Sequence, residues 1–400
     1  PFYPVSSPYI TKKDIDSVNR ALKSGWISSD GPEIKKFEKE FSRFIDKKYS
    51  VAVSSGTAAL EIAIKALDIK KNDEVLIPNF TIISNALAVI RQQAKPVLID
   101  CNLKDWNIKI EDIEKNISKK TKAIIITHIY SFPNEMQKIL KICKKYNLLV
   151  IEDAAEVLGL KYKNKMCGSF GDISIFSFYA NKQVTSGEGG MLSMNSLQIY
   201  EKCKSLRNLC FGKLNRFNHD DLGWNYRMTN MQAALGLSQL KNIKYMVNKK
   251  MEIGSYYYKK LYQNSNIQIL PPSNEFSKNI YWVVGEKNRN KKGFQNTLFA
   301  IRKDNELFYK VLKELKHNLK KISKKYENLT LFSYIGLTGH NKYRGSGSDI
   351  NKLVIFKDYE EKNNFKYKTP VFSTAKIRNF LSASVFHKTK DEKIVSTMLD

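Results

Sequence analysis

The chain has 400 residues, and the 42% that are hydrophobic supply enough apolar material for the cores of two or three domains. Its five cysteines have no Cys-x-x-Cys or zinc-binding spacing, no signal-peptide pattern opens the chain, and no apolar run approaches the roughly 20 residues that span a bilayer. The formal net charge is +28, from 67 Lys and Arg against 39 Asp and Glu. These features favour a cytoplasmic protein with reduced thiols, without a metal site or a membrane contact.

Two helices are predicted before residue 50. The segment 12–22 has a helical pattern, and Phe37, Phe41 and Phe44 recur at helical spacing in the second helix. The residues between them, 25–32, are rich in Gly, Ser and Pro and are typical of a loop.

From residue 50 onward, short apolar strands alternate with amphipathic helices. The predicted strands are 50–53, 74–77, 95–99, 123–127, 148–152 and 173–178, and the predicted helices are 57–67, 84–92, 110–117 and 136–146. Such alternation is typical of βαβ units, in which helices cover both faces of a mostly parallel sheet. The sequence therefore predicts an α/β fold.

The pattern changes after about residue 225. Residues 230–247 form one long helical stretch that continues toward residue 261, and Pro271-Pro272 interrupts the chain. We place a domain boundary near residue 250. Residues 1–250 are expected to form a large cofactor-binding domain, and residues 251–400 a smaller α/β C-terminal domain, atypical in sequence after about residue 285.

Two segments carry residues suited to catalysis. Asp153 follows a buried parallel strand, so it lies at the carboxyl edge of the sheet, where ligands bind in open α/β folds. Lys182 follows the next predicted strand, beyond the Ser177 hydroxyl. It precedes the glycine-rich turn 187–190, whose glycines let the backbone pass close to a ligand.

A third segment, residues 53–60, is a strand, a small-residue turn with Gly56 and Thr57, and a helix start. Backbone N–H groups at a helix N-terminus bind phosphate well, although this segment taken alone favours an ordinary helix N-cap. Together the three segments supply what pyridoxal 5′-phosphate requires. These are an amine for a Schiff base, a carboxylate for the pyridinium nitrogen, and a phosphate site.

These segments resemble the family of nucleotide-sugar aminotransferases of pyridoxal-phosphate fold type I, and within it the perosamine-synthase-like C-4 aminotransferases. The resemblance covers about residues 5–283. It is carried by the motifs at 24–29, 54–60, 128–130, 152–156, 168–172, 182–190 and 223–229. Because several independent motifs occur in the right order, the resemblance is specific.

The resemblance implies a role for each matching residue. Lys182 would form the Schiff base and shuttle the proton, Asp153 would pair with the pyridine nitrogen, and Glu156 would lie beside the ring. The phosphate would be held by Gly56, Thr57 and Ser177.

Four further residues have roles implied by the resemblance. Asn225 would reach the phosphate in the neighbouring subunit, so a homodimer would share its active sites. Ile82 would cover the cofactor ring where the family usually has an aromatic residue. Arg227 would stabilise this loop or the interface, and His128 would lie either near the cofactor or packed at a strand end.

The implied reaction is transamination. L-Glutamate would give its amino group to the cofactor, leaving 2-oxoglutarate, and the nitrogen would pass to C-4 of a nucleotide-linked 4-keto-6-deoxyhexose for O-antigen or other surface polysaccharide. The related 3-dehydratases carry histidine in place of the lysine, so Lys182 favours amine transfer. The residues do not separate C-4 from C-3 amination.

Two other classes of protein remain open. The atypical segment 286–400 allows a degenerate family member that keeps the fold without turnover and acts as a scaffold or partner. The charge of +28 allows a polyanion such as nucleic acid, an anionic small substrate, or lysines spread over solvated helix faces. The last is favoured, because the lysines fall mostly in amphipathic segments such as 138–146. We therefore expect no nucleic-acid partner.

Overall fold

The computed structural model describes residues 7–212, 217–264, 267–288, 329–333 and 353–357. By the contacts between residues, Ser6–Asn290 forms one compact unit, which contains the central sheet. The strands β12 (Leu329–Ser333) and β13 (Leu353–Lys357) belong to a second unit, where they pair antiparallel with each other. The domain boundary near residue 250 stays a prediction.

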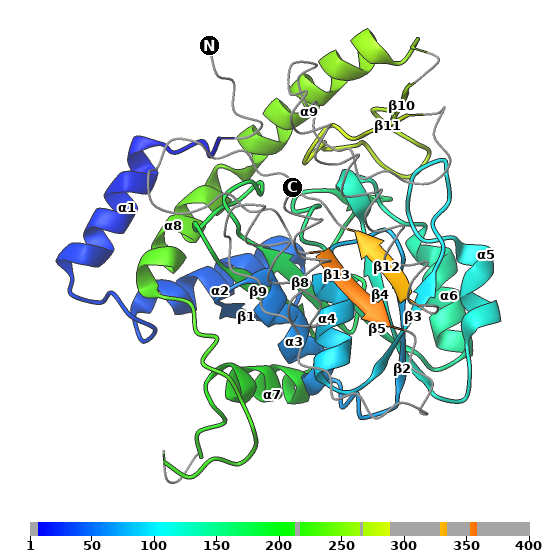
Figure 1. Ribbon diagram of the computed structural model, residues 1–400. Coiled ribbons are helices and arrows are strands. Elements are labelled where there is room, and N and C mark those ends of the chain that lie inside the picture. Colours follow the sequence, from blue (N-terminus) through cyan, green and yellow to red (C-terminus); the bar gives the residue numbers. More distant parts are fainter. Residues whose placement is uncertain (1–6, 213–216, 265–266, 289–328, 334–352, 358–400) are drawn as a thin grey trace, which may run out of the picture. The chain divides into compact units, whose positions relative to one another are not determined.

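A seven-stranded sheet forms the centre of the first unit (Figure 1). In spatial order its strands are β1 (Tyr49–Val53), β9 (Gly190–Met194), β8 (Ile173–Ser177), β5 (Leu149–Asp153), β4 (Thr121–Thr127), β2 (Glu74–Pro78) and β3 (Lys95–Ile99). Only β9 runs antiparallel to its neighbours, so the predicted α/β fold with a mostly parallel sheet is confirmed. The sequence does not predict β9, because it contains a glycine and no β-branched residue.

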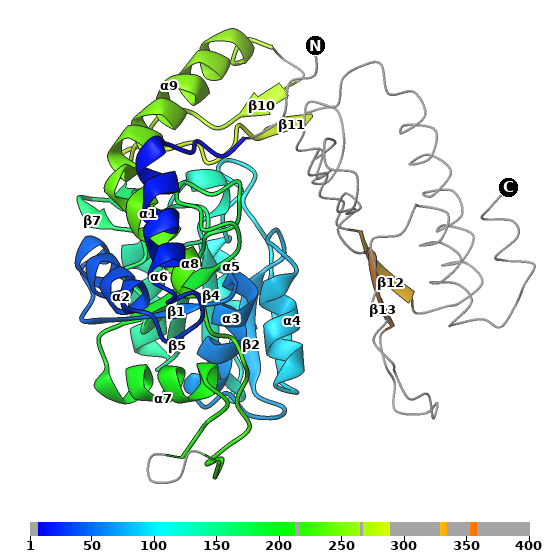
Figure 2. The ribbon, with the colours of Figure 1, turned by 90° about the vertical axis from the view of Figure 1, so that its left-hand side faces the viewer.

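Helices cover both faces of the sheet (Figures 1 and 2). The helices α3 (Gly56–Ala66), α4 (Ser84–Arg91) and α7 (Leu197–Arg207) pack on one face, and α2 (Pro32–Ile45), α6 (Met136–Lys145) and α8 (Asn230–Lys241) pack on the other. In β4, Ala123 and Ile125 face the first group while Ile124 and Ile126 face the second. Strands buried on both faces explain why the sequence shows nearly continuous apolar runs.

The remaining described elements complete the first unit. They are α1 (Lys12–Lys23), α5 (Ile110–Ile113), η1 (Glu114–Asn116), η2 (Ile129–Ser131), α9 (Ile243–Leu261), β6 (Lys161–Tyr162), β7 (Lys165–Met166), β10 (Ile267–Ile269) and β11 (Glu286–Asn288). In the part of the chain that the structure describes, no helix is long and apolar enough to cross a membrane.

Two helices differ from the sequence prediction. The long helix predicted from residue 230 is interrupted at Asn242, whose backbone (φ −98°, ψ 3°) leaves the helical region and separates α8 from α9. Asparagine favours such a position because its side chain competes with helical backbone bonding. The helix predicted at 110–117 is the short α5 followed by the 3₁₀ turn η1.

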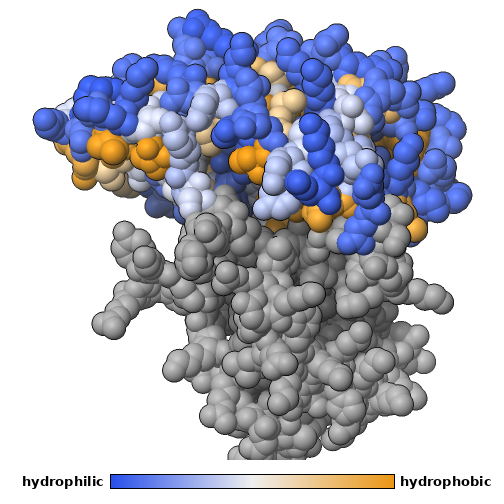
Figure 3. Space-filling model, turned by 90° about the horizontal axis from the view of Figure 1, so that it is seen from above, coloured by the Kyte–Doolittle hydropathy of each residue, from blue (hydrophilic) through white to orange (hydrophobic). Residues whose placement is uncertain are grey.

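The surface shown in Figure 3 is mostly hydrophilic, with hydrophobic side chains in small separate groups. Several exposed lysines lie three or four residues from an acid on the same helix, namely Lys12 with Asp16, Lys36 with Glu33, Lys138 with Glu135, and Lys249 with Glu252. Such pairs belong to solvated helix faces and add little stability. They agree with the favoured interpretation of the charge.

Candidate active site

The predicted site residues lie at one edge of the sheet. Because β1, β5 and β8 are mutually parallel, their carboxyl ends meet there. Asp153 ends β5, Ser177 ends β8, and Gly56 follows β1. Lys182 lies in the connection that leaves β8, so strands far apart in the sequence bring these residues together.

Asp153 is almost fully buried, with 2% of its surface exposed. Its Oδ2 accepts hydrogen bonds from Asn85 Nδ2 (3.1 Å) and Thr127 Oγ1 (3.4 Å), and its Oδ1 accepts from the N–H of Ala155 (3.2 Å). Burial raises the pKa of Asp153, although these hydrogen bonds and the charge of Lys182 oppose the rise. Among the described residues no cation is in salt-bridge contact with this carboxylate, so it is suited to a positively charged ligand atom.

Lys182 and Glu156 form a titrating pair beside Asp153. Burial lowers the pKa of Lys182, while the charges of Glu156 and Asp153 act to raise it. Burial also raises the pKa of Glu156, whose Oε2 accepts the N–H of Tyr130 at 2.7 Å. Lys182 and Glu156 can exist as an ion pair or as a neutral amine beside a protonated carboxyl. The two opposite pKa shifts bring these states closer in free energy, so a nucleophilic amine is accessible at neutral pH.

The N-terminus of α3 provides the third part of the site. Ser55 Oγ accepts the N–H of Ala58 (3.1 Å), which leaves the first N–H groups of the helix, those of Gly56 and Thr57, open to a ligand. A Cβ on residue 56 would lie 2.9 Å from the Ser177 Cβ, so this close approach requires glycine. The Ser177 hydroxyl is therefore held next to an anion-binding helix N-terminus.

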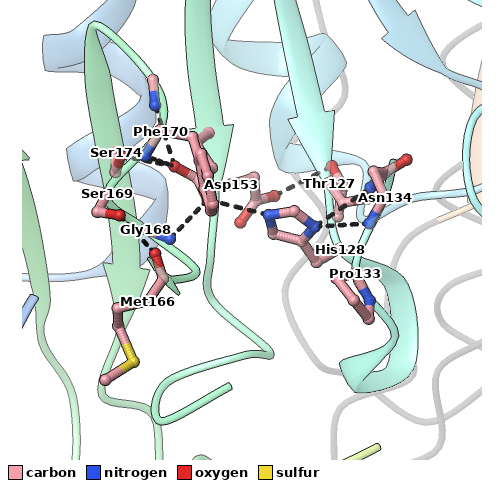
Figure 4. Close-up of polar contacts among 12 residues, drawn as sticks. Thr127, His128, Pro133, Asn134, Asp153, Met166, Gly168, Ser169, Phe170 and Ser174 are labelled. Carbon is pink, nitrogen blue, oxygen red and sulfur yellow. Dashed lines mark hydrogen bonds and ion pairs between the residues drawn. The ribbon is translucent and has the colours of Figure 1, made fainter. Parts of the chain in front are cut away.

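A buried network fixes the neighbouring strand ends (Figure 4). His128 is fully buried, its Nδ1 accepts the N–H of Asn134 (3.1 Å), and its Nε2 therefore carries the proton and donates to Glu152 Oε1 (3.0 Å). Glu152 also accepts backbone N–H groups of the turn 168–171. Of the two roles expected for His128, the structure supports packing at the strand end, because successive residues on β5 turn Glu152 and Asp153 to opposite faces.

Hydrogen bonding and burial have opposite effects on the pKa of Glu152. Burial alone acts to raise the pKa of this carboxyl, but the hydrogen bond from His128, with those from the backbone donors, lowers it below the ordinary value. The network thus keeps Glu152 ionised and ties the turn 168–171 to the strand that carries Asp153.

Ile82 and Asn225 each lie next to a residue that bonds to a strand end at this edge: Thr81 donates to Thr127, and the Tyr226 carbonyl accepts the N–H of Ser54 (2.8 Å). Ile82 is 37% exposed and follows Thr81, which donates to Thr127 at 3.0 Å, so it lies near the sheet edge. Asn225 is exposed in the segment between α7 and α8. Its role toward a neighbouring subunit stays a prediction. Arg227 donates to Asn208 Oδ1 (2.7 Å), as expected for a residue that stabilises this loop.

Three residues near the site were not predicted. Asn85 and Thr127 hold Asp153, and their only sequence signal is a polar side chain at the end of an apolar strand or the start of an apolar helix. Trp282 lies over Lys182, with its ring centroid 3.5 Å from Nζ, and its Nε1 donates to the Asn181 carbonyl (2.9 Å). No local pattern connects Trp282 with a lysine one hundred positions earlier.

The site fits pyridoxal phosphate, because a glycine cradle, a buried carboxylate that forms no salt bridge among the described residues and a lysine amine with a lowered pKa meet at one sheet edge. Fold and site together define a pyridoxal-phosphate-dependent aminotransferase. The chain matches the DegT/DnrJ/EryC1/StrS aminotransferase family over residues 8–329, and it belongs to that family. The predicted family, enzyme class and cofactor are thereby confirmed, and the match extends past residue 283, where the sequence motifs end.

Individual relatives agree with this assignment. The chain is 38% identical over 347 residues to the GDP-perosamine synthase of Escherichia coli O157:H7, covering 85% of this chain and 92% of that protein. It is 38% identical over 258 residues to the GDP-perosamine synthase of Vibrio cholerae, covering 64% and 70%. The X-ray structure of the aminotransferase from Psychrobacter cryohalolentis matches with a TM-score of 0.67 at 30% identity, covering 80% of this chain and 82% of that one.

Proposed function

We propose that the protein transfers the amino group of L-glutamate to C-4 of a nucleotide-linked 4-keto-6-deoxyhexose, for the synthesis of a surface polysaccharide. The sugar nucleotide best supported is GDP-4-keto-6-deoxymannose, because the relatives from Escherichia coli and Vibrio cholerae are GDP-perosamine synthases. The observation that carries the proposal is the amine of Lys182, on which the charges of both Glu156 and Asp153 act. A lysine there favours amine transfer over the dehydration that related enzymes with histidine perform.

Pyridoxal phosphate, when bound, supplies an aldehyde that takes up the amino group and a ring that withdraws electrons. The residues of the chain orient it. Asp153, held by Asn85 and Thr127, would stabilise a proton on the ring nitrogen. The N–H groups of Gly56 and Thr57 would bind the phosphate at the start of α3.

Lys182 would then transfer the proton of the amino donor's α-carbon. Its lowered pKa keeps a larger share of Nζ neutral, and a neutral amine accepts the proton from the α-carbon of the amino donor and returns it at the sugar carbon. Glu156, whose pKa is raised, would take up or release a proton beside it. The Trp282 ring over Nζ would exclude water from this exchange.

The proposal includes a homodimer with shared sites. The segment between α7 and α8 extends away from α7 in Figure 1, and it carries Asn225. Two large hydrophobic side chains of this segment, Phe217 and Leu222, are 81% and 83% exposed. Exposed apolar side chains around Asn225 support burial against a second subunit.

An absorption spectrum of the protein with pyridoxal phosphate, before and after L-glutamate, tests the first half of the reaction. We expect a visible band that L-glutamate removes, and no such response in Lys182→Ala. Mass spectrometry of GDP-4-keto-6-deoxymannose incubated with the protein and L-glutamate tests the second half. A band without product from any nucleotide-linked 4-keto sugar would instead favour the degenerate scaffold.

A further inference from the structure

A second lysine lies beside Lys182 and has no part in the steps above. Lys250 projects from α9, and its Nζ donates a hydrogen bond to the Trp282 carbonyl (2.9 Å). Among the residues that the structure describes, no carboxylate forms an ion pair with it. Its neighbour Lys249, by contrast, is exposed and pairs with Glu252 at 2.8 Å. Lys250 is therefore a partly buried cation with no ion pair among the described residues.

Trp282 holds the two lysines close together. Its ring faces Lys182 Nζ at 3.5 Å from the centroid, and its backbone carbonyl accepts the hydrogen bond from Lys250. The indole is itself fixed, because Nε1 donates to the Asn181 carbonyl and the ring stacks on Tyr130 at 6.3 Å and 15°. A single immobilised residue thus contacts both cations, one through its ring and one through its carbonyl.

The charge of Lys250 favours the binding of an anion. Burial, with a contribution from the charge of Lys182, lowers the pKa of Lys250 to about 8. Lys250 therefore remains mostly protonated at neutral pH. Lys250 has lost part of its hydration, and an arriving anion would compensate its charge.

We propose that Lys250 binds the α-carboxylate of the amino donor, and of the oxo acid that the donor becomes; this rests on the proposed amine transfer. The donor nitrogen must reach the position of Lys182 Nζ. Its carboxyl carbon is two covalent bonds away, about 2.5 Å from that nitrogen. The diphosphate of the sugar nucleotide lies across the whole hexose ring from C-4. A cation that shares Trp282 with Lys182 therefore lies on the side of the carboxylate rather than of the diphosphate.

The test is calorimetric binding of 2-oxoglutarate to the holoenzyme in its pyridoxal form, which has no amino group to transfer. Lys250→Gln keeps a donor for the Trp282 carbonyl but removes the charge. We expect it to weaken binding about 10- to 100-fold, as for the loss of a charged hydrogen bond. Lys250→Arg should recover most of the affinity. Lys249→Gln, with the same change in net charge outside the site, should leave it unchanged.

Kinetics give a second readout. Lys250→Gln should raise the KM for L-glutamate and leave the KM for the nucleotide sugar and the affinity for GDP unchanged. Equal melting temperatures and equal cofactor absorbance would show that the variant is folded and loaded.

Three results would overturn the proposal. The wild type would bind no 2-oxoglutarate, or Lys250→Gln would bind 2-oxoglutarate as tightly as the wild type, or Lys250→Gln would lose affinity for GDP alone. If the wild type transfers no amine to any sugar while Lys250→Gln still loses 2-oxoglutarate, the carboxylate site stands and the proposed sugar reaction fails.

Discussion

Replacing Glu152 with glutamine tests the buried network behind the active site. Glu152 is fully buried and accepts five hydrogen bonds. Its Oε1 accepts from His128 Nε2 (3.0 Å) and the N–H of Gly168 (2.5 Å), and its Oε2 accepts from the N–H of Phe170 (2.8 Å), the N–H of Gly171 (3.1 Å) and Ser174 Oγ (3.2 Å). Glutamine has nearly the same shape, so the substitution mainly replaces one acceptor oxygen with an NH₂ donor and removes the negative charge.

The amide keeps one acceptor oxygen, which best serves the three donors at the Oε2 position. Its NH₂ group then faces His128 Nε2 and the Gly168 N–H, and both donors lose their acceptor. His128 cannot relieve this by changing tautomer, because its Nδ1 accepts the N–H of Asn134 (3.1 Å). Each stranded donor costs about 1–3 kcal/mol, so Glu152→Gln should lower the free energy of unfolding by about 2–6 kcal/mol.

Urea unfolding of the apoprotein at pH 7 measures this difference from the midpoints, provided that the slopes of the two transitions agree. Glu252→Gln is the matched control, since the Glu252 side chain is 68% exposed and, among the described residues, its ion pair is with Lys249. It should shift the free energy of unfolding by less than about 0.5 kcal/mol. A loss below about 1 kcal/mol for Glu152→Gln would refute the view that these donors depend on the carboxylate.

The stability difference between the wild type and Glu152→Gln should depend on pH. Because the pKa of Glu152 is lowered in the folded state, its stabilisation is present above the pKa of the unfolded chain and is lost as the pH falls through the folded value. The wild type should therefore lose more stability than Glu152→Gln when the pH falls from 7 to below the ordinary glutamate value of 4.5. A constant difference across that range would show that the charge of Glu152 is not what the network uses.

Gly56→Ala would place a Cβ 2.9 Å from that of Ser177, so equilibrium dialysis should show about tenfold weaker binding of pyridoxal phosphate. Unchanged affinity would contradict the steric argument. Lys182→Ala should abolish amine transfer in the product assay without lowering the melting temperature of the apoprotein, because it removes an enclosed charge. Mixing Lys182→Ala with Asn225→Ala protein should restore about a quarter of the wild-type activity, since half of the mixed dimers' sites are intact and about half of the dimers are mixed. No recovery would mean that Asn225 acts within its own subunit.

The parts of the site that the sequence predicts are those set by strand ends. The apolar run before Asp153 predicts β5, and parallel strands bring such ends to one edge regardless of their separation in the chain. Lys182, Ser177 and Gly56 follow the same rule. The positions of their backbones are therefore predictable from local pattern and sheet topology together.

Contacts that depend on packing angles are not predictable in this way. The approach of Trp282 to Lys182 requires the chain beyond α9 to return over the sheet edge, and no periodicity in residues 267–288 specifies that path. The break between α8 and α9 rests on the backbone of the single residue Asn242, within a stretch whose apolar pattern continues on both sides. Lys250 acquires its enclosed position from both of these features.

The adjacent acids Glu152 and Asp153 show how neighbours in sequence acquire different chemistry. Both are buried, yet the pKa of Glu152 is lowered and that of Asp153 is raised. The alternation of β5 turns Glu152 toward His128 and the donors of the turn 168–171, which satisfy its charge. It turns Asp153 toward Asn85 and Thr127, which supply fewer donors and leave its charge undercompensated. A carboxylate left in that state gains most from a cationic ring nitrogen. The strand that anchors the fold through Glu152 on one face would therefore bind the cofactor through Asp153 on the other.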